Sequence, residues 1–305
     1  MRILFAGTPQ VAVTVLGALV NGGHEVVGVL TREDSPVGRK RTLQSSPVAE
    51  FAFAKGIPVL KKNKIRAEDL EEITSLNADI AIVVAYGSLL SKSVLDVIPQ
   101  GWFNLHFSLL PKYRGAAPVQ HAIKEGQTET GVSLFRLDEG MDTGDLVGQV
   151  TTKIEPDENA GVLLQRLAHL GVTLLNQELP KIYAGTATLT PQIGEPSFAP
   201  KLSRQDAEID FNKSAEEIDC LIRAMNPEPM AWAMVEEMPV RILDARPVNL
   251  KIDLEPGSIV SSDRAMVVVC GGGTCLEITE IQPAGKKQMS GQEWIRGHQS
   301  VHRFD

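Results

Sequence analysis

The order of apolar segments in the first half of the chain constrains the fold more than any other feature. Four short runs rich in β-branched and other apolar residues indicate strands: residues 2–6, 24–30, 57–60 and 78–85. Helix-like segments separate them: residues 9–21, 47–55 and 67–76. Continuously hydrophobic strands that alternate with helices are typical of a parallel sheet covered on both faces. The pattern predicts a doubly wound, mostly parallel α/β fold, which binds ligands at the carboxyl ends of its strands.

Beyond this region the pattern changes twice. Residues 132–137 and 146–154 indicate two more strands, and residues 160–184 indicate a long helix. Residues 185–200 are rich in Gly, Pro and Thr, which is typical of a linker. The remaining sequence predicts a short helix at 215–225 and then five short strands with tight turns, which suggest a small β-barrel. A length of 305 residues also favours two domains.

Composition indicates an intracellular globular protein. No apolar run reaches the roughly 18–20 residues needed to cross a bilayer. The first seven residues indicate a buried strand rather than a signal peptide. The cysteines, Cys220, Cys270 and Cys275, are few and odd in number, which argues against a disulfide framework. We expect a protein of the reducing cytoplasm, without membrane contact.

The charge is acidic overall but unevenly distributed. A formal net charge of −8 argues against a general nucleic-acid binder, because such proteins are usually basic. Between residues 37 and 66, however, eight Lys or Arg residues stand against one acid, Glu50. A local basic surface can bind phosphates, but a solvated loop and helix face has the same composition. Charge alone leaves both interpretations open.

A group of polar residues with catalytic potential lies around residue 105. Asn104 and His106 are two residues apart in a predicted strand, so alternation places their side chains on one face. Asp142 follows in the turn between the two later strands. An amide, an imidazole and a carboxylate that converge suit the attack of an amine on a carbonyl, because they offer oxyanion donors and proton carriers. A histidine at a strand end is often structural, so spacing alone leaves the role of His106 open.

Other kinds of site fit the sequence less well. The turn after the first strand lacks Gly-x-Gly-x-x-Gly and the Gly-Lys-Ser/Thr of a phosphate loop, so a plain strand-to-helix turn is favoured. Ser108 lies near His106, but Gly-x-Ser-x-Gly is absent, and a local hydrogen bond is the better interpretation of Ser108. His106, His121 and Asp142 do not have the spacing of a metal site, and we expect no metal.

A longer motif resembles a known family. The run Asn104-Leu-His106-Phe-Ser-Leu-Leu-Pro111-Lys-Tyr-Arg114-Gly115, with Asp142 in Met-Asp-Thr-Gly-Asp145, resembles the signature of formyltransferases that use 10-formyltetrahydrofolate. Supporting stretches extend over nearly the whole chain: residues 5–9, 115–120, 223–227 and 282–290. Two residues depart from the pattern, Val11 in place of an aromatic residue and Phe107 in place of Gly or Pro. Neither departure removes a reacting group.

The resemblance implies a domain organisation and a reaction. Residues 1–188 would form a Rossmann-like formyltransferase domain, 189–206 a linker, and 207–305 a barrel similar to an oligonucleotide-binding (OB) fold. The implied reaction transfers the formyl group of 10-formyltetrahydrofolate to the α-amino group of methionyl initiator tRNA. Asn104 and protonated His106 would stabilise the oxyanion. Asp142 would orient His106 and help to move the proton of the amine.

The resemblance also implies two binding surfaces. The folate pterin is expected between one wall at Val84, Leu89 and Leu90 and a second wall at Ser108, Leu109, Leu110 and Pro111. An inserted loop at 33–46 is expected to contact the tRNA acceptor stem through Arg39, Lys40 and Arg41. Lys286 and Lys287 would add phosphate contacts from the second domain. No obligate protein partner is evident.

Three alternatives share parts of this pattern. A nucleotide amino-sugar N-formyltransferase would use the same donor and first domain, and it would need no basic loop. A catalytically silent RNA- or folate-binding module is disfavoured because Asn104, His106 and Asp142 are all present. A purine-pathway formyltransferase is disfavoured because it would have no use for the second domain.

Overall fold

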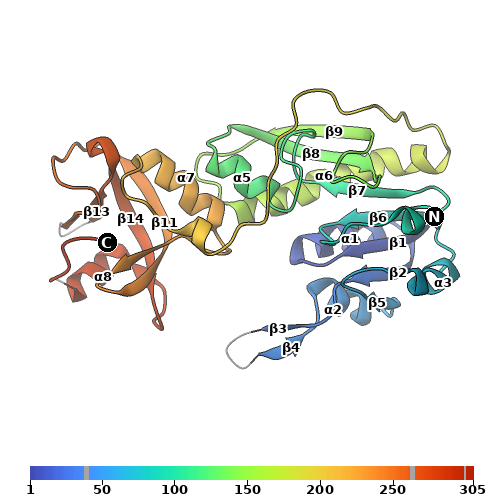
Figure 1. Ribbon diagram of the computed structural model, residues 1–305, viewed down its shortest axis with the longest axis horizontal. Helices are drawn as coiled ribbons and strands as arrows, with labels where there is room; N and C mark the ends of the chain where they lie inside the picture. Colours follow the sequence, from blue (N-terminus) through green and yellow to red (C-terminus); the bar gives the residue numbers. More distant parts are fainter. Residues whose placement is uncertain (38–40, 262–264, 299) are drawn as a thin grey trace. The chain divides into compact units, whose positions relative to one another are not determined.

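The computed structural model describes residues 1–37, 41–261, 265–298 and 300–305 (Figure 1). The chain forms two compact units. The first comprises Met1–Pro118, Glu129–Lys153 and Leu164–Pro200, and the second comprises Val119–Thr128, Ile154–Leu163 and Lys201–Asp305. These compact units are each made of several segments of the chain, so they do not test the domain boundaries expected at residues 188 and 207. Those boundaries stay a prediction.

A seven-stranded sheet is the frame of the first unit, with the strand order β5-β2-β1-β6-β7-β8-β9. The first five strands in this order are parallel: β5 (Val59–Lys61), β2 (Glu25–Thr31), β1 (Arg2–Gly7), β6 (Ile80–Val84) and β7 (Trp102–His106). The last two are added by antiparallel pairing: β8 (Glu129–Arg136) and β9 (Leu146–Lys153). The predicted doubly wound, mostly parallel sheet is confirmed.

Helices cover both faces of this sheet. On one face, Leu4 and Ala6 of β1 pack in a buried cluster with Ile73 and Val94, which belong to α3 (Leu70–Ser75) and α4 (Lys92–Leu95). On the other face lie α1 (Gln10–Asn21) and α2 (Pro47–Ala54), as their contacts with β1, β2 and β5 show. The long helix α6 (Ala160–Tyr183) approaches β7 at Gly171, where any side chain would collide with Leu105. Alternation along the strands sends successive apolar residues into these two layers.

The remaining elements of the first unit are short. They are the hairpin β3 (Ser35–Val37) and β4 (Thr42–Gln44), and the 3-10 turn η1 (Ala67–Asp69). β6 and β7 end beside each other, because Val83 is the register partner of Asn104. Residues 85–87 and 104–108 therefore lie at one edge of the sheet, as the sequence predicted.

The second unit is built on a curled antiparallel sheet (Figure 1). Its strand order is β10-β11-β14-β13-β12, with β15 paired to β14. The strands are β10 (Trp232–Val235), β11 (Met238–Val248), β12 (Ile259–Ser261), β13 (Met266–Val269), β14 (Cys275–Pro283) and β15 (Met289–Ser290). The helices and 3-10 turns are α5 (Pro118–Lys124), η2 (Gln205–Ala207), α7 (Ala215–Met225), η3 (Gly271–Gly273) and α8 (Gly291–Gly297). This half-barrel agrees with the small OB-like β domain that the sequence predicted.

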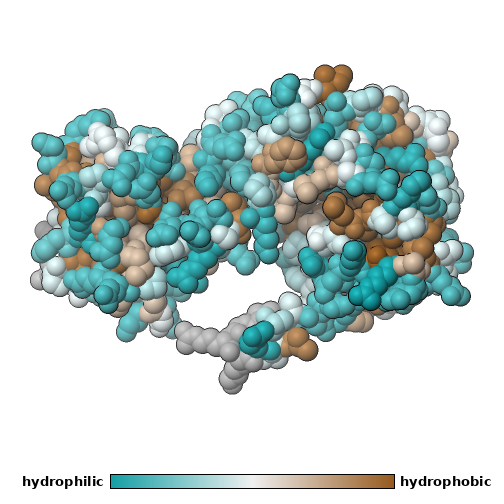
Figure 2. Space-filling model, viewed as in Figure 1, coloured by the Kyte–Doolittle hydropathy of each residue, from teal (hydrophilic) through white to brown (hydrophobic). Residues whose placement is uncertain are grey.

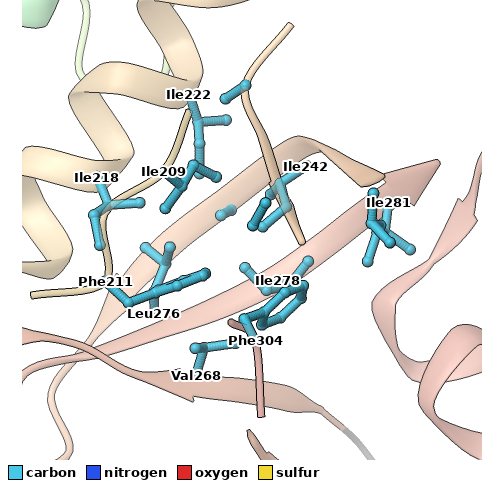
Figure 3. Packing of buried hydrophobic residues seen from close by; sticks show 14 of the residues in the cluster. Ile209, Phe211, Ile218, Ile222, Ile242, Val268, Leu276, Ile278, Ile281 and Phe304 are labelled. Carbon is cyan, nitrogen blue, oxygen red and sulfur yellow. The ribbon is translucent and has the colours of Figure 1, made fainter. Parts of the chain in front are cut away.

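One apolar cluster fills the inside of this sheet (Figure 3). Ile218 and Ile222 of α7 point at Leu276 and Ile278 of β14, and Phe304 closes the cluster near the chain terminus. The helix begins at a capping box, in which Ser214 and Glu217 satisfy each other's backbone N–H groups. This cap stabilises the start of α7, and burial of its apolar face in the cluster holds the helix against the sheet.

Raising the pH from 8 to 10.5 should lower the free energy of unfolding. Burial raises the pKa of the Cys270 thiol to about 12 from an ordinary value of 9.0, and the pKa of the Tyr86 phenol to about 12 from 10.0. The folded chain therefore keeps protons that the unfolded chain releases, and stability that is present below pH 9 is lost as the pH rises toward 12. We expect a loss of about 2 kcal/mol in urea titrations. Equal stability at the two pH values would contradict this prediction, and Cys270→Ala should flatten the pH dependence.

Hydrophilic side chains cover much of the visible face of each unit, and apolar side chains are exposed in smaller patches (Figure 2). In the first unit, exposed apolar residues include Leu89, Ile193 and Phe198. The helices of the described segments are too short or too polar to cross a membrane. The three cysteines, Cys220, Cys270 and Cys275, are free thiols.

Candidate active site

The antiparallel edge of the first sheet presents a row of polar side chains. Asn104 and His106 lie on one face of β7, and their register partners on β8 are Phe135 and Ser133. Ser133 is in turn the partner of Gln149 on β9. Residues directly opposite each other in antiparallel strands share a face, so these five side chains, four of them polar, lie together. The predicted strand at 102–106 and the predicted shared face of Asn104 and His106 are confirmed.

The His106 ring is buried, with a hydrogen bond at one nitrogen and a carboxylate near the other. Its Nε2 lies 2.9 Å from the backbone oxygen of Tyr113, and its Nδ1 lies 3.8 Å from Oδ2 of Asp142. A carbonyl oxygen only accepts, so this hydrogen-bond network assigns a proton to Nε2. The second nitrogen, Nδ1, then faces the Asp142 carboxylate. The Phe135 ring and the imidazole form a T-shaped pair, with a centroid distance of 6.5 Å and an interplanar angle of 83°.

Asp142 is held in an unusual backbone conformation. Its φ of 53° lies in the left-handed region, which non-glycine residues adopt infrequently. Its Oδ2 accepts a hydrogen bond of 2.7 Å from the backbone N–H of Gly115. The carboxylate therefore faces the loop after β7 and the Nδ1 side of His106 at the same time. The structure brings Asn104, His106 and Asp142 to one region, and their catalytic roles stay predictions.

Asn104 has an unsatisfied polar atom. Its Oδ1 is buried and has no hydrogen-bond partner among the described residues. Buried polar atoms in native proteins are nearly always paired, so each exception indicates strain, function or a missing ligand. On the same face of β7 as His106, this amide oxygen is an acceptor that is available to a donor on a reacting group.

The loop after β7 is tied to the sheet by residues that the sequence did not single out. Ser133 Oγ donates to the Ser108 oxygen at 2.6 Å and accepts from the Leu110 N–H at 3.1 Å. Gln149 Nε2 donates to Ser133 Oγ at 2.8 Å and to the Leu110 oxygen at 3.0 Å. The one available signal was Ser133 itself, a small polar residue between the apolar residues Val132 and Leu134.

The residues predicted to bind the pterin differ in environment. Val84, Ser108, Leu110 and Pro111 are buried, Leu90 packs in the core with Val94, and Leu89 is 62% exposed. The Leu109 side chain packs over Gly131, where a β-carbon would collide with it. Ser108 Oγ donates to the Lys112 oxygen at 2.6 Å. That local hydrogen bond is the one the sequence favoured over a nucleophilic role, and pterin contact stays a prediction.

The residues predicted to bind tRNA are placed only in part. Arg39 and Lys40 lie outside the described residues, and Arg41 is exposed immediately before β4. Lys286 and Lys287 are exposed in the turn that follows β14. Within the basic region, Lys61 pairs with Asp34 at 2.6 Å and lowers the pKa of that carboxyl. Lys62 pairs with Asp69 at 2.6 Å, and this contact raises the pKa of Lys62. These two charges are therefore engaged inside the first unit.

Comparison with known proteins assigns the family. The N-terminal domain model of formyl transferases matches residues 1–179, and the C-terminal domain model of the same family matches residues 201–299. The chain belongs to the formyl transferase family. Among its relatives, the methionyl-tRNA formyltransferase of Arthrobacter sp. strain FB24 is 47% identical over 300 residues, or 97% of each chain. That of Corynebacterium glutamicum strain R is 44% identical and covers 98% of each chain.

Solved structures of other formyl transferases share the fold. The sugar 3N-formyl transferase WlaRD matches 94% of this chain and 99% of its own, with a TM-score of 0.68 and 19% identity. The methionyl-tRNA formyltransferase from Clostridium thermocellum matches 89% of this chain and 100% of its own, with a TM-score of 0.57 and 15% identity. At these identities the likeness concerns the fold alone. Among the described residues of this formyl transferase, no group of three or more His, Cys, Asp or Glu is arranged to hold a metal ion.

Proposed function

We propose that this formyl transferase moves the formyl group of 10-formyltetrahydrofolate to the α-amino group of methionyl initiator tRNA. The observation that supports this most strongly is an identity of 43–47% with proteins named methionyl-tRNA formyltransferase, over nearly the full length of both chains. The sugar formyl transferases among the solved structures are much more distant, at about 20% identity. The acceptor is therefore methionyl-tRNA, and the chain acts in translation initiation.

The proposed chemistry follows from the geometry around His106. The neutral α-amine attacks the formyl carbon, a new C–N bond forms, and the carbonyl oxygen becomes an oxyanion. Asn104 donates its amide N–H to that oxyanion. Protonated His106 offers the Nδ1–H as a second donor, since its Nε2–H is already used by Tyr113. Preorganised donors of this kind are often the largest single contribution to catalysis.

The proton inventory balances within the same group of residues. The attacking amine loses one proton, and N10 of tetrahydrofolate gains one as the C–N10 bond breaks. Asp142 lies beside Nδ1 of His106 and stabilises the charged imidazole while the proton moves. Water carries the proton between groups that are not in direct contact. No covalent enzyme intermediate is needed.

The donor is proposed to lie against the loop 108–111. Ser133 and Gln149 tie the backbone of this loop to the sheet next to His106. A flat pterin needs an apolar slot with backbone polar groups at its edge, and Leu109, Leu110 and Pro111 provide such a wall. A loop that is fixed before binding reduces the ordering cost when the donor arrives.

Acceptor choice is the direct test of this function. The purified chain, 10-formyltetrahydrofolate and one acceptor at a time would be incubated: charged initiator methionyl-tRNA, charged elongator methionyl-tRNA, or a 4-amino-sugar nucleotide. We expect rapid formylation of the initiator alone. Transfer to the sugar nucleotide instead would retain the three catalytic residues and refute the tRNA proposal. Absence of transfer to all three acceptors would refute formyl transfer to these substrates.

The loop 33–46 is proposed to bind the tRNA acceptor stem. Arg39→Ala combined with Arg41→Ala should raise KM for tRNA, because both side chains would contact phosphates. The slope of log affinity against log salt should become shallower by about 1–2, since fewer counterions are released on binding. Lys92→Ala combined with Lys181→Ala removes two charges that are engaged in ion pairs elsewhere in the first unit. An unchanged slope in the Arg39/Arg41 variant, or an equal change in this control, would contradict the proposal.

A further inference from the structure

The segment of residues 190–199, here called the strap, is bonded to two separate segments of the first unit. At its start, Thr190 and Leu146 exchange backbone hydrogen bonds of 2.8 and 2.9 Å. At its end, Ser197 and Ala199 bond the backbone of Arg114, and Ala199 also accepts from the N–H of Ala117. Leu146 directly follows the loop that contains Asp142, and Arg114 and Ala117 lie on either side of Gly115 in the loop after β7. The strap therefore connects the two loops that meet at the candidate active site.

Gln192 is the residue of the strap that reaches the backbone of Asp142. Its Nε2 donates to the Asp142 oxygen at 2.8 Å and to the Gly144 oxygen at 2.9 Å. Its Oε1 accepts from Nη2 of Arg114 at 2.7 Å. A guanidinium only donates and a carbonyl only accepts. The two neighbours therefore fix which end of the amide faces which loop.

The turn around Asp142 depends on hydrogen bonds from a residue outside the turn. Asp142 itself has a φ of 53°, a conformation with an energetic cost for a non-glycine residue. Within the turn, Asp138 accepts from the Gly140 N–H and from Thr143 Oγ1. These bonds order the first half of the turn. The peptide oxygens of Asp142 and Gly144 are bonded instead by Gln192, so the direction of the carboxylate depends on the strap.

We propose that Gln192 is a positioning residue for Asp142. By holding the backbone on both sides of Thr143, Gln192 keeps Oδ2 of Asp142 on the Gly115 N–H and within 3.8 Å of His106 Nδ1. The catalytic side of this inference rests on the proposed formyl transfer. The structural part of the inference does not depend on that reaction. Hydrogen exchange of the Gly115 N–H, which is bonded to Asp142 Oδ2, shows directly whether the carboxylate is in place.

Two substitutions distinguish the hydrogen bonds that Gln192 donates from the volume that its side chain fills. Gln192→Ala removes all three hydrogen bonds. Gln192→Glu keeps the size and the contact with Arg114, but it cannot donate and places a carboxylate against two carbonyl oxygens. Both variants should release the turn. Glu195→Ala, an exposed residue of the same strap, is the matched control and should behave as the parent chain.

Residue-resolved amide hydrogen exchange on the full chain is the first measurement. Gly115 N–H should exchange at least tenfold faster in Gln192→Ala and Gln192→Glu. Ala117 N–H, which the strap holds through Ala199, should change less than twofold. Asp142→Ala should reproduce the Gly115 effect. Unchanged protection of Gly115 would overturn the proposal, and equal loss of protection at Ala117 would indicate detachment of the whole strap and overturn it as well.

Turnover provides the second measurement. Gln192→Ala should lower kcat by on the order of 10- to 100-fold, because a small displacement of a catalytic group has effects of this size, and KM for tRNA should stay the same. In an Asp142→Asn background, Gln192→Ala should cause no further loss of kcat. An equal loss in both backgrounds would overturn the proposal. A parent chain that formylates no acceptor would refute the proposed function, while the exchange result would still decide the structural role of Gln192.

Discussion

Replacing Asn104 or His106 with alanine should lower kcat by two or more orders of magnitude while the fold survives. Each side chain is assigned to the oxyanion, and loss of one preorganised donor costs about 2.7–4 kcal/mol of transition-state stabilisation. The cost to folding should be modest. Asn104 Oδ1 has no partner to lose among the described residues, and His106→Ala leaves the Tyr113 carbonyl without its imidazole partner, at a cost of about 1–3 kcal/mol. Steady-state kinetics at saturating donor and acceptor, with thermal unfolding of each variant, would measure both effects.

His169→Ala is a suitable control for this pair of variants. His169 is an exposed histidine on α6 of the first unit, so its removal tests whether loss of any imidazole affects the assay. Near-normal turnover in Asn104→Ala or His106→Ala would refute the assignment of that residue. A reduced kcat in His169→Ala of the same size would show that the assay is reporting on something other than the oxyanion.

Most of the fold of the first unit could be predicted from hydrophobic patterning. Buried parallel strands leave continuous apolar runs, and for this reason β1, β2 and β6 were located within one or two residues. α1 was also located within one residue, between the first two apolar runs. The antiparallel direction of β8 and β9 was not predicted. Direction depends on which neighbour a strand pairs with, and a single strand contains no information about that neighbour.

Short elements were missed for a different reason. The hairpin β3–β4 has three residues in each strand, and α5 has seven residues, so neither is long enough to show a period. The sequence of α8 does contain a signal for its start. Ser290 and Glu293 are spaced as a capping box, and the structure shows both of its reciprocal hydrogen bonds.

The candidate site was predictable only as far as side-chain alternation and family resemblance extend. Alternation placed Asn104 and His106 on one face, Asp142 was added from the turn between the two later strands, and the resemblance gave each of the three a role. The atoms that orient them could not be predicted: the Tyr113 carbonyl bonds His106, and Gln192 bonds the backbone of Asp142. A backbone oxygen has no sequence signature. Gln192 is fifty residues from Asp142, inside a segment whose composition indicated only a linker.

Replacing Gly115 with alanine should abolish most of the activity and destabilise the first unit. Gly115 has a φ of +124°, and a β-carbon would lie 2.7 Å from the backbone oxygen of Ala199. That oxygen cannot retreat freely, because it accepts the N–H of Ala117. Backbone strain and overpacking together should cost on the order of 3–5 kcal/mol. Because the Gly115 N–H is bonded to Asp142, relief of the strain by loop movement would displace the carboxylate. We expect a loss of kcat of about 100-fold or more.

Gly185→Ala separates the general effect of a positive φ from the specific collision. Gly185 has a φ of +68° and no atom within 4 Å of its would-be β-carbon, so alanine there should cost only about 1–2 kcal/mol and leave kcat unchanged. Thermal unfolding and kinetics of the two variants, measured side by side, would compare them. If Gly115→Ala proved no worse than Gly185→Ala, the strap would be able to move away without consequence. The link between its position and the placement of Asp142 would then be wrong, even with the three catalytic residues intact.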